Sequence, residues 1–181
     1  VWDVDTSHAK SRRLAKEELD RMMSKFDDHT INNLGLTIND QLADIDQITS
    51  RAIAKAQNED LDIIAIDHAQ ELTVNRKNRG GVRDAEVIAP AVKKITRQTG
   101  CLVVLLSQVT ELDNGSWRLR GGDEYRHEAD FVFIIRYPAS VKFGEEADDP
   151  DSFRDVVVAK GRDTGQGKVQ VPFYGPYLQF G

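Results

Sequence analysis

The sequence is poor in the features that mark secreted, membrane-spanning or strongly basic proteins. Cys101 is the single cysteine in 181 residues, which excludes an internal disulfide and favours a reducing compartment. No apolar run approaches the ~20 residues that a membrane-spanning helix needs. The formal net charge of −6 excludes a protein coated in basic surface, although a local basic patch could still bind nucleic acid. What remains, with 40% hydrophobic and 30% charged residues, is typical of a globular domain.

The segment Leu61–Gln70 (LDIIAIDHAQ) is the most informative part of the chain. A short apolar run of this kind is typical of a strand buried on both faces of a parallel sheet. Asp67 would then lie at the carboxyl end of the strand, where open α/β sheets bind their ligands. A carboxylate there can hold the Mg²⁺ of a bound nucleoside triphosphate, directly or through water. The simpler interpretation, a strand followed by a turn, stays open on this segment alone.

Helical and strand patterns alternate along the earlier part of the chain and give way to strands alone near its end. Helices are expected at about 7–25, 40–57 and 84–99, with Thr37 or Asn39 capping the second and Gly100 ending the third. Strands are expected at 61–67, 101–106, 130–136, 155–159, 168–173 and 176–180, with a polar loop over 107–129. This order predicts one α/β domain over 1–181, with a mostly parallel central sheet flanked by helices and an antiparallel C-terminal extension.

Four further segments carry the rest of the pattern. They are VVLLSQ at 103–108, LRGGD at 119–123, AKGRDTGQG at 159–167 and VPFYGPYLQF at 171–180. Together with Leu61–Gln70, and in this order, they resemble the RecA-like motor domain of DnaB-type replicative helicases over nearly the whole chain. The resemblance implies a RecA-like fold, hydrolysis of ATP or another nucleoside triphosphate with Mg²⁺, and a homo-oligomer that we expect to be a hexameric ring.

The resemblance also implies roles in nucleotide hydrolysis for several polar residues. Asp67 would hold Mg²⁺. Gln108 would orient the attacking water or sense the γ-phosphate, since a carboxamide can both donate and accept a hydrogen bond. Lys160 and Arg162 would reach the nucleotide bound to the neighbouring subunit. The simpler interpretation of Lys160 and Arg162 is an edge strand with solvated charges, and that of Gln108 is a polar strand end.

Two basic segments are candidates for contact with single-stranded DNA. The first surrounds Gly80 and Gly81 and consists of Arg76, Lys77, Arg79 and Arg83. The second is Arg120 with the two residues that follow it, Gly121 and Gly122, where the lack of side chains would let backbone amides approach a phosphate closely. A mobile cationic loop could follow a phosphate backbone, whereas the simpler interpretation is a charged loop in contact with solvent.

The chain departs from the family pattern in three places. It contains no phosphate-binding loop of the form Gly-x-x-x-x-Gly-Lys-Ser/Thr, and we expect that loop upstream of Val1, in a protein that begins earlier. Asp5 stands where the family has its catalytic glutamate and would activate the attacking water, with Asp3 as the alternative. Gly121–Asp123 stands where family members usually have Glu-Ser-Gly after the arginine.

The resemblance therefore implies a ring-helicase motor that couples nucleoside triphosphate hydrolysis to movement along single-stranded DNA at replication. The expected partners are single-stranded DNA, further copies of the chain and primase, with no membrane. The expected location is the cytoplasm of a bacterial or phage-infected cell, with the mitochondrial matrix as the alternative. Two other interpretations stay open, namely a recombinase or clock-type ATPase with the same fold, and a non-catalytic fragment that binds DNA. The isolated chain is expected to be inactive because it lacks the phosphate-binding loop.

Overall fold

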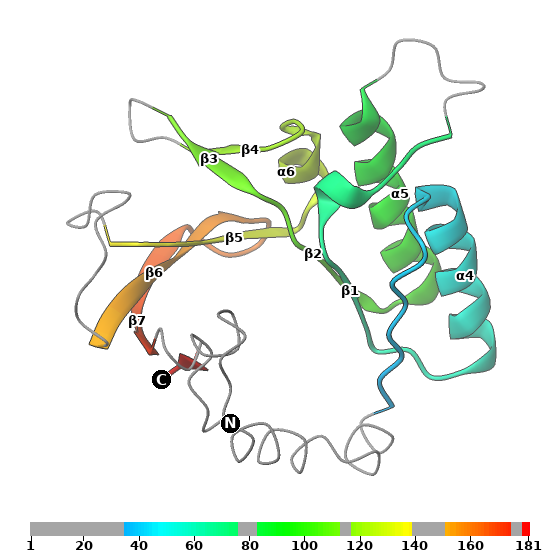
Figure 1. Cartoon of the computed structure of the whole chain (residues 1–181), viewed down its shortest axis with the longest axis horizontal. Helices are drawn as coiled ribbons and strands as arrows, with labels where there is room; N and C mark the ends of the chain where they lie inside the picture. Colours follow the sequence, from blue (N-terminus) through cyan, green and yellow to red (C-terminus); the bar gives the residue numbers. More distant parts are fainter. Residues whose placement is uncertain (1–34, 76–82, 113–116, 139–150, 175–178) are drawn as a thin grey trace, which may run out of the picture. The chain divides into compact units, whose positions relative to one another are not determined.

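The computed structural model describes residues 35–75, 83–112, 117–138, 151–174 and 179–181 (Figure 1). The chain forms two compact units. The first, Asn39–Asp130, holds all the long helices described and is called the helical unit here. The second, which joins Val1–Ile38 to Phe131–Gly181, is called the sheet unit because its described elements are strands.

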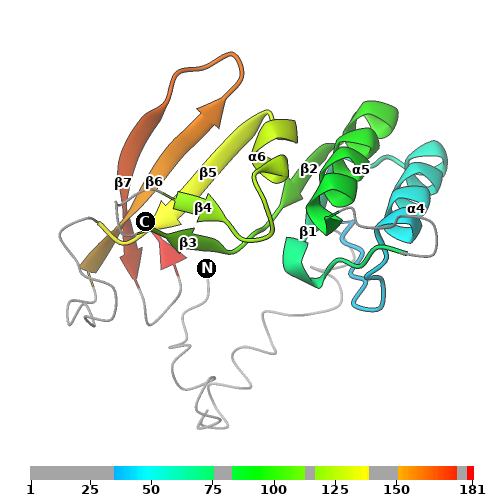
Figure 2. The same cartoon turned by 90° about the horizontal axis from the view of Figure 1, so that it is seen from above.

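In the helical unit, two long helices alternate with two short parallel strands, and a hairpin and a short helix follow. In chain order the elements are α4 (Ile45–Asn58), β1 (Ile63–Ile66), the 3₁₀ helix η1 (Ala69–Glu71), α5 (Asp84–Thr99), β2 (Leu102–Leu105), β3 (Val109–Glu111), β4 (Trp117–Leu119) and α6 (Glu124–Glu128). Strands β1 and β2 pair in parallel, with Ile63 opposite Leu102 at one end. Figures 1 and 2 show α4 and α5 side by side along this pair.

Helix α4 begins later than the sequence pattern predicts. Its N-cap is Asp44, whose side chain accepts hydrogen bonds from the backbone amides of Asp46 and Gln47. Asn39 makes a separate turn instead, with Oδ1 accepting from the amides of Gln41 and Leu42 at 3.0 and 3.1 Å. The predicted start near residue 40, capped by Thr37 or Asn39, is therefore wrong, because Asp44 is a second capping residue closer to the apolar stripe.

Helix α5 has the bounds that its sequence predicts. It runs from Asp84 to Thr99 and ends at Gly100, which has φ of +76° and donates its amide to Thr96 O at 2.9 Å. A left-handed residue at this position is what glycine allows without steric cost. Pro90 lies inside the helix without dividing it into two helices.

The core of the helical unit lies between the two long helices and one face of the strand pair. Ile45 of α4 and Ile88 and Ile95 of α5 are fully buried, and Ile64 and Ile66 pack against them or their neighbours. The opposite face is open: Ile63 is 59% exposed and Leu102 of β2 is 58% exposed. The prediction of a strand buried on both faces is therefore wrong for β1 in this structure, because the described helices cover one face only.

The stretch after β2, predicted to be a polar loop, contains regular structure. Strands β3 and β4 pair antiparallel, from Val109 opposite Leu119 to Glu111 opposite Trp117, and α6 follows. Strands of three residues are too short to show a reliable alternation of apolar and polar side chains. The hairpin brings the two segments beside it, which carry Gln108 and Arg120, next to each other.

In the sheet unit, the described strands form one antiparallel sheet in the order β5-β6-β7-β8. They are β5 (Phe131–Arg136), β6 (Asp151–Gly161), β7 (Gly167–Tyr174) and β8 (Gln179–Phe180). This confirms the predicted antiparallel ending, in which β6 and β7 form a hairpin. Among the described strands of the whole chain only β1 and β2 are parallel, so the mostly parallel central sheet stays a prediction.

The centre of the sheet unit is held by a buried carboxylate, Asp155. It lies on β6 with Arg136 of β5 and Gln170 of β7 directly opposite on either side. Gln170 Nε2 donates to Asp155 Oδ1 at 3.0 Å, and Lys168 Nζ and Arg136 Nε lie 3.3 and 3.5 Å from Oδ2. The hydrogen bond from Gln170, with further contributions from Lys168 and Arg136, outweighs the effect of burial and lowers the pKa of Asp155. The charged form thus ties three strands together.

Candidate functional site

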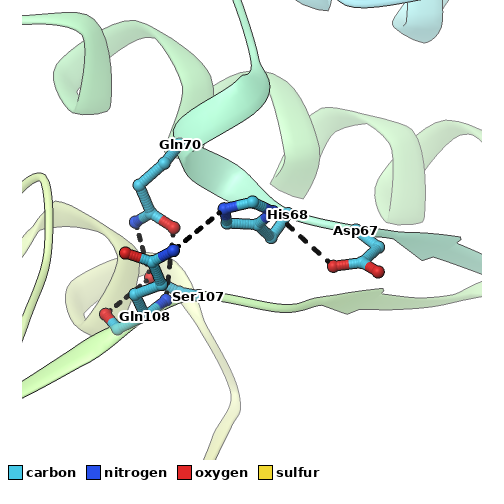
Figure 3. A network of polar contacts seen from close by, with 5 residues as sticks. All are labelled: Asp67, His68, Gln70, Ser107 and Gln108. Carbon is cyan, nitrogen blue, oxygen red and sulfur yellow. Dashed lines mark hydrogen bonds and ion pairs between the residues drawn. The ribbon is translucent and has the colours of Figure 1, made fainter. Parts of the chain in front are cut away.

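The carboxyl ends of the two parallel strands meet at one edge of the helical unit, and Asp67 lies there (Figure 3). Leu106 N donates to Ile66 O at 3.0 Å, and Ala69 N donates to Leu106 O at 2.8 Å, so the chain segments that leave β1 and β2 stay in register past the strand ends. The Asp67 side chain is 78% exposed. The structure thus places this carboxylate where the sequence predicts it, free to bind a ligand from solvent.

His68 lies between Asp67 and Gln108 (Figure 3). Its Nδ1 is 3.7 Å from Asp67 Oδ1 and its Nε2 is 3.3 Å from Gln108 Nε2. Gln108 Oε1 already accepts a hydrogen bond from Arg120 Nη1 at 2.6 Å, so the Gln108 amide nitrogen is the group that donates to His68. The imidazole therefore accepts at Nε2 and carries its proton on Nδ1, on the side of Asp67. From sequence, His68 is expected to pack on the next element, with contact to nucleotide or DNA as the alternative, and its contact with Gln108 was not predicted.

Gln108 and Arg120 are the two predicted site residues that the structure brings into direct contact. Besides the side-chain bond, Arg120 N donates to Gln108 O at 2.9 Å. Both side chains are exposed. A residue predicted to respond to phosphate and a residue predicted to respond to DNA are thus joined by two hydrogen bonds.

Gln70 completes the network, and sequence analysis did not find it. Its Nε2 donates to Arg120 O at 2.6 Å and to Ser107 Oγ at 3.0 Å, while its Oε1 accepts from Gln108 N at 3.2 Å. Gln70 lies in η1 between the buried residues Ala69 and Leu72. Its position between two apolar residues, directly after the strand that ends at Asp67, is the signal that could have identified it.

Gly121 and Gly122 follow Arg120 with φ of +107° and +145°, conformations that favour glycine. A Cβ on Gly121 would lie 3.2 Å from Tyr125 Cε2, and one on Gly122 would lie 3.4 Å from Ala85 Cβ. Gly122, predicted to contact DNA, is buried. The two glycines have a packing role that sequence analysis did not foresee, since they let the chain turn tightly from β4 into α6.

Lys160 and Arg162 lie in the sheet unit. Lys160 is half-buried in β6 opposite Val132 of β5, and Arg162 is exposed just after Gly161, the last residue of that strand. Lys160 therefore lies within the strand, whereas Arg162 lies just beyond its end. Their role at a neighbouring subunit stays a prediction.

Several predicted residues lie outside the described part of the chain, namely Asp3, Asp5, Arg76, Lys77 and Arg79. Arg83 is the member of the first basic segment that the structure describes. It is the exposed residue before α5, and its Nε lies 4.0 Å from Glu86 Oε1. An exposed pair at this distance contributes little to stability, so Arg83 remains available for an anion.

Asp67 suits a magnesium ion that is held mainly by other ligands. Over the described ranges, no group of three or more histidine, cysteine, aspartate or glutamate side chains is arranged to hold a metal ion. Mg²⁺ commonly keeps several waters and binds through one or two carboxylates together with substrate phosphates, which fits one exposed carboxylate at a strand end.

Within the same ranges, no helix has the length and apolar character needed to cross a membrane.

Comparison with known proteins gives a consistent result. Residues 2–181 match the family model described as DnaB-like helicase C terminal domain. The fold is similar to that of a solved ATPase domain, with a TM-score of 0.70 and 20% identity over 98% of this chain and 65% of that chain. It is also similar to a DnaB-like replicative helicase whose structure was described with its interactions with primase, with a TM-score of 0.70 and 21% identity over 97% of this chain and 43% of that one. No curated protein matches the chain. The chain thus spans less than two thirds of each of these two solved structures.

Proposed function

This chain belongs to the DnaB-like helicase C terminal domain family, and we propose that it forms part of a motor that couples hydrolysis of ATP, or another nucleoside triphosphate, to movement along single-stranded DNA. The observation that carries the proposal is the bond of 2.6 Å between Arg120 Nη1 and Gln108 Oε1, at the strand ends beside Asp67. This bond joins Gln108, whose carboxamide suits contact with phosphate, to Arg120, whose guanidinium suits contact with DNA. The family match also sets aside the recombinase and clock-type alternatives.

Nucleotide would bind at the carboxyl ends of β1 and β2, with its phosphates cradled by a loop that we place upstream of Val1. Asp67 would hold Mg²⁺ directly or through water. The chemistry that Mg²⁺ supplies is neutralisation of charge on the β- and γ-phosphates. Asp5, or alternatively Asp3, would take a proton from the attacking water. The exposed Asp67 carboxylate supports its part of this arrangement.

Gln108 would orient the water or contact the γ-phosphate, and its contact with Arg120 would carry the state of the nucleotide to DNA. Its carboxamide oxygen accepts from Arg120 Nη1 and one of its two N–H groups points to His68, so the other N–H could donate to a phosphate oxygen. Any reorientation of the carboxamide toward phosphate would also move the oxygen that holds Arg120. That linked movement is a physical route by which hydrolysis could change the position of Arg120.

DNA would be bound by the two basic segments, through phosphate rather than base contacts. Arg76, Lys77, Arg79 and Arg83 form the first segment, and Arg120 with Gly122 forms the second. Arg120 would contact a phosphate with its guanidinium. The part of Gly122 is indirect, because a buried glycine shapes the turn that presents Arg120.

We infer further that the motor works as a ring, expected to be a hexamer, in the cytoplasm. Lys160 and Arg162 would act on the nucleotide of the adjacent subunit and stabilise the charge of the transition state. The exposed turn that holds Arg162, between β6 and β7, supports access to a neighbour. Primase is a proposed partner, since a similar solved structure carries interactions with primase.

The proposal is tested by hydrolysis and unwinding in the protein that includes the phosphate-binding loop. The wild-type protein should hydrolyse ATP faster when single-stranded DNA is added and should unwind a forked duplex. Asp67→Asn should lose both activities. Asp62→Asn is the matched control, because Asp62 is an exposed aspartate just before β1, at the strand end remote from the site. Absence of DNA-stimulated hydrolysis in the folded wild-type oligomer would contradict the proposal.

A further inference from the structure

The backbones of Gln108 and Arg120 continue the register of the β3–β4 hairpin. In that hairpin Val109 lies opposite Leu119, so Gln108 and Arg120 form the next pair. Residues of a hydrogen-bonded antiparallel pair normally exchange two bonds, each amide donating to the opposite carbonyl. Here one of the two is present, from Arg120 N to Gln108 O at 2.9 Å.

A side chain takes the place of the second bond. Gln108 N donates to Gln70 Oε1 at 3.2 Å, and Gln70 Nε2 donates to Arg120 O at 2.6 Å. The carboxamide of Gln70 thus stands between the amide of Gln108 and the carbonyl of Arg120. A carboxamide can do this because, like a peptide group, it offers both a donor and an acceptor. Glutamate keeps only the acceptor at neutral pH, and methionine of similar length offers neither group in comparable strength.

The inserted side chain comes from the turn that follows Asp67. Gln70 belongs to η1, which is tied to the end of β2 by the bond from Ala69 N to Leu106 O at 2.8 Å. Gln70 also donates to Ser107 Oγ at 3.0 Å. One carboxamide therefore contacts the segment after β2 at two residues and the segment after β4 at one. Displacement of the turn after Asp67 would be transmitted directly to Gln108 and Arg120.

We propose that Gln70 is a positioning residue whose carboxamide, inserted between Gln108 and Arg120, couples the turn that carries Asp67 to the segment that contacts DNA. The hydrogen bonds of Gln70 to Gln108 and Arg120 do not depend on any ligand, whereas the coupling to DNA rests on the proposed function. Gln70 itself would contact neither the nucleotide nor the DNA. It acts by setting the position of two residues that would contact phosphate and DNA.

The first arm of the test measures hydrogen exchange at the Gln108 amide in the purified protein without nucleotide or DNA. Gln70→Met keeps the length of the side chain and removes the acceptor, so exchange at Gln108 should be about fivefold faster, as expected for the loss of one hydrogen bond. Gln98→Met, at an exposed position of α5, is the matched control and should leave this exchange rate unchanged. Unchanged protection of Gln108 in a folded Gln70→Met variant would overturn the insertion.

The second arm measures the affinity for single-stranded DNA with and without a non-hydrolysable ATP analogue. The ratio of the two affinities is the coupling between the sites. It should fall to within about twofold of one in Gln70→Met and in Gln70→Glu, which cannot donate to Arg120, and should keep its wild-type value in Gln98→Met. A purely packing role would be preserved by methionine, so a wild-type ratio in Gln70→Met would overturn the coupling. If the wild-type ratio is itself one and hydrolysis is absent, the proposed function fails, and the exchange arm alone decides whether Gln70 holds Gln108.

Discussion

Arg120 binds Gln108 twice, through Nη1 to Oε1 at 2.6 Å and through its backbone amide to the Gln108 carbonyl at 2.9 Å. The two residues come from opposite sides of a hairpin, so this contact joins the carboxyl end of β2 to the turn before α6. Because the first bond holds the Gln108 oxygen toward Arg120, the amide nitrogen of Gln108 is the group that faces His68. The orientation of Gln108, which we propose contacts phosphate, therefore depends on Arg120, which we propose contacts DNA.

Two replacements of Arg120 should distinguish the contribution of its positive charge to DNA binding from that of its planar guanidinium. Arg120→Ala should weaken binding of single-stranded DNA and reduce the slope of log affinity against log salt by ~0.7, the value for one phosphate contact. Arg120→Lys should restore most of that slope, because lysine keeps the charge but lacks the planar fork that reaches Gln108. DNA affinity over a salt series measures both effects. Arg97→Ala, an exposed arginine in the last turn of α5, should change neither, and an unchanged slope in Arg120→Ala would exclude the phosphate contact.

Replacing Arg76, Lys77, Arg79 and Arg83 together by alanine should flatten the same salt dependence further. Each lost phosphate contact removes ~0.7 from the slope for single strands. Hydrolysis without DNA should persist, since these residues take no part in the nucleotide site, while the stimulation by DNA should fall. A folded variant with the wild-type slope would show that this segment is only solvated.

Arg162→Ala should abolish hydrolysis while nucleotide binding remains, because the residue is proposed to act on the neighbouring subunit. Mixing Arg162→Ala subunits with Asp67→Asn subunits should restore part of the activity, since some interfaces then contain both intact groups. Steady-state hydrolysis across mixing ratios measures the rescue. Asp67→Asn mixed with a second preparation of itself is the control. No rescue under conditions of demonstrated subunit exchange would contradict action between subunits.

Gly121→Ala should destabilise the turn before α6. At φ of +107° an added Cβ is strained and would lie 3.2 Å from Tyr125 Cε2, so we expect a loss of about 1–2 kcal/mol in the free energy of unfolding. Gly165→Ala is the matched control, because a Cβ there meets nothing within 4 Å and the backbone conformation is ordinary. Chemical denaturation of both variants measures the difference. Equal stability would mean that the turn relaxes without cost.

Asp155 should make the stability of the sheet unit depend on pH in acid. Its pKa is lowered on folding, chiefly by the hydrogen bond from Gln170, so the unfolded chain takes up a proton at higher pH than the folded one. The stabilisation is fully present above the ordinary pKa of about 4 and is lost as pH falls below it. Asp155→Asn should lower Tm by about 5 °C or more near neutral pH and reduce the loss of Tm between pH 5 and 3. Thermal unfolding against pH checks both, and the same acid dependence in Asp155→Asn would refute this assignment.

The parts of the fold that sequence predicted are those determined by local signals. Gly100 ends α5 because the backbone needs a left-handed residue there, and Asp67 ends an apolar run long enough to be recognised. The start of α4 was missed because Asn39 and Asp44 both suit an N-cap, and only the position of the core decides between them. Strands β3 and β4 were missed because three residues show no clear period.

The candidate site was predictable in its residue types but not in its connections. Asp67 and Gln108 lie at or near the ends of strands that a pattern can show, and Arg120 was recognised by its charge and the two glycines that follow it. The insertion of Gln70 depends on three segments that are distant in sequence and meet only in the folded unit. The same holds for His68, whose partner on each ring nitrogen is set by packing. Non-local hydrogen bonds of this kind leave almost no trace in a single sequence.

The most direct test of the central claim is the stimulation of ATP hydrolysis by single-stranded DNA in Gln108→Met. Methionine keeps the length of the side chain but cannot accept the bond from Arg120 Nη1 or donate to His68. The protein that includes the phosphate-binding loop should bind DNA and ATP in this variant, and added DNA should no longer raise its rate of hydrolysis. A wild-type degree of stimulation in folded, oligomeric Gln108→Met would contradict the claim that Gln108 and Arg120 link the two sites.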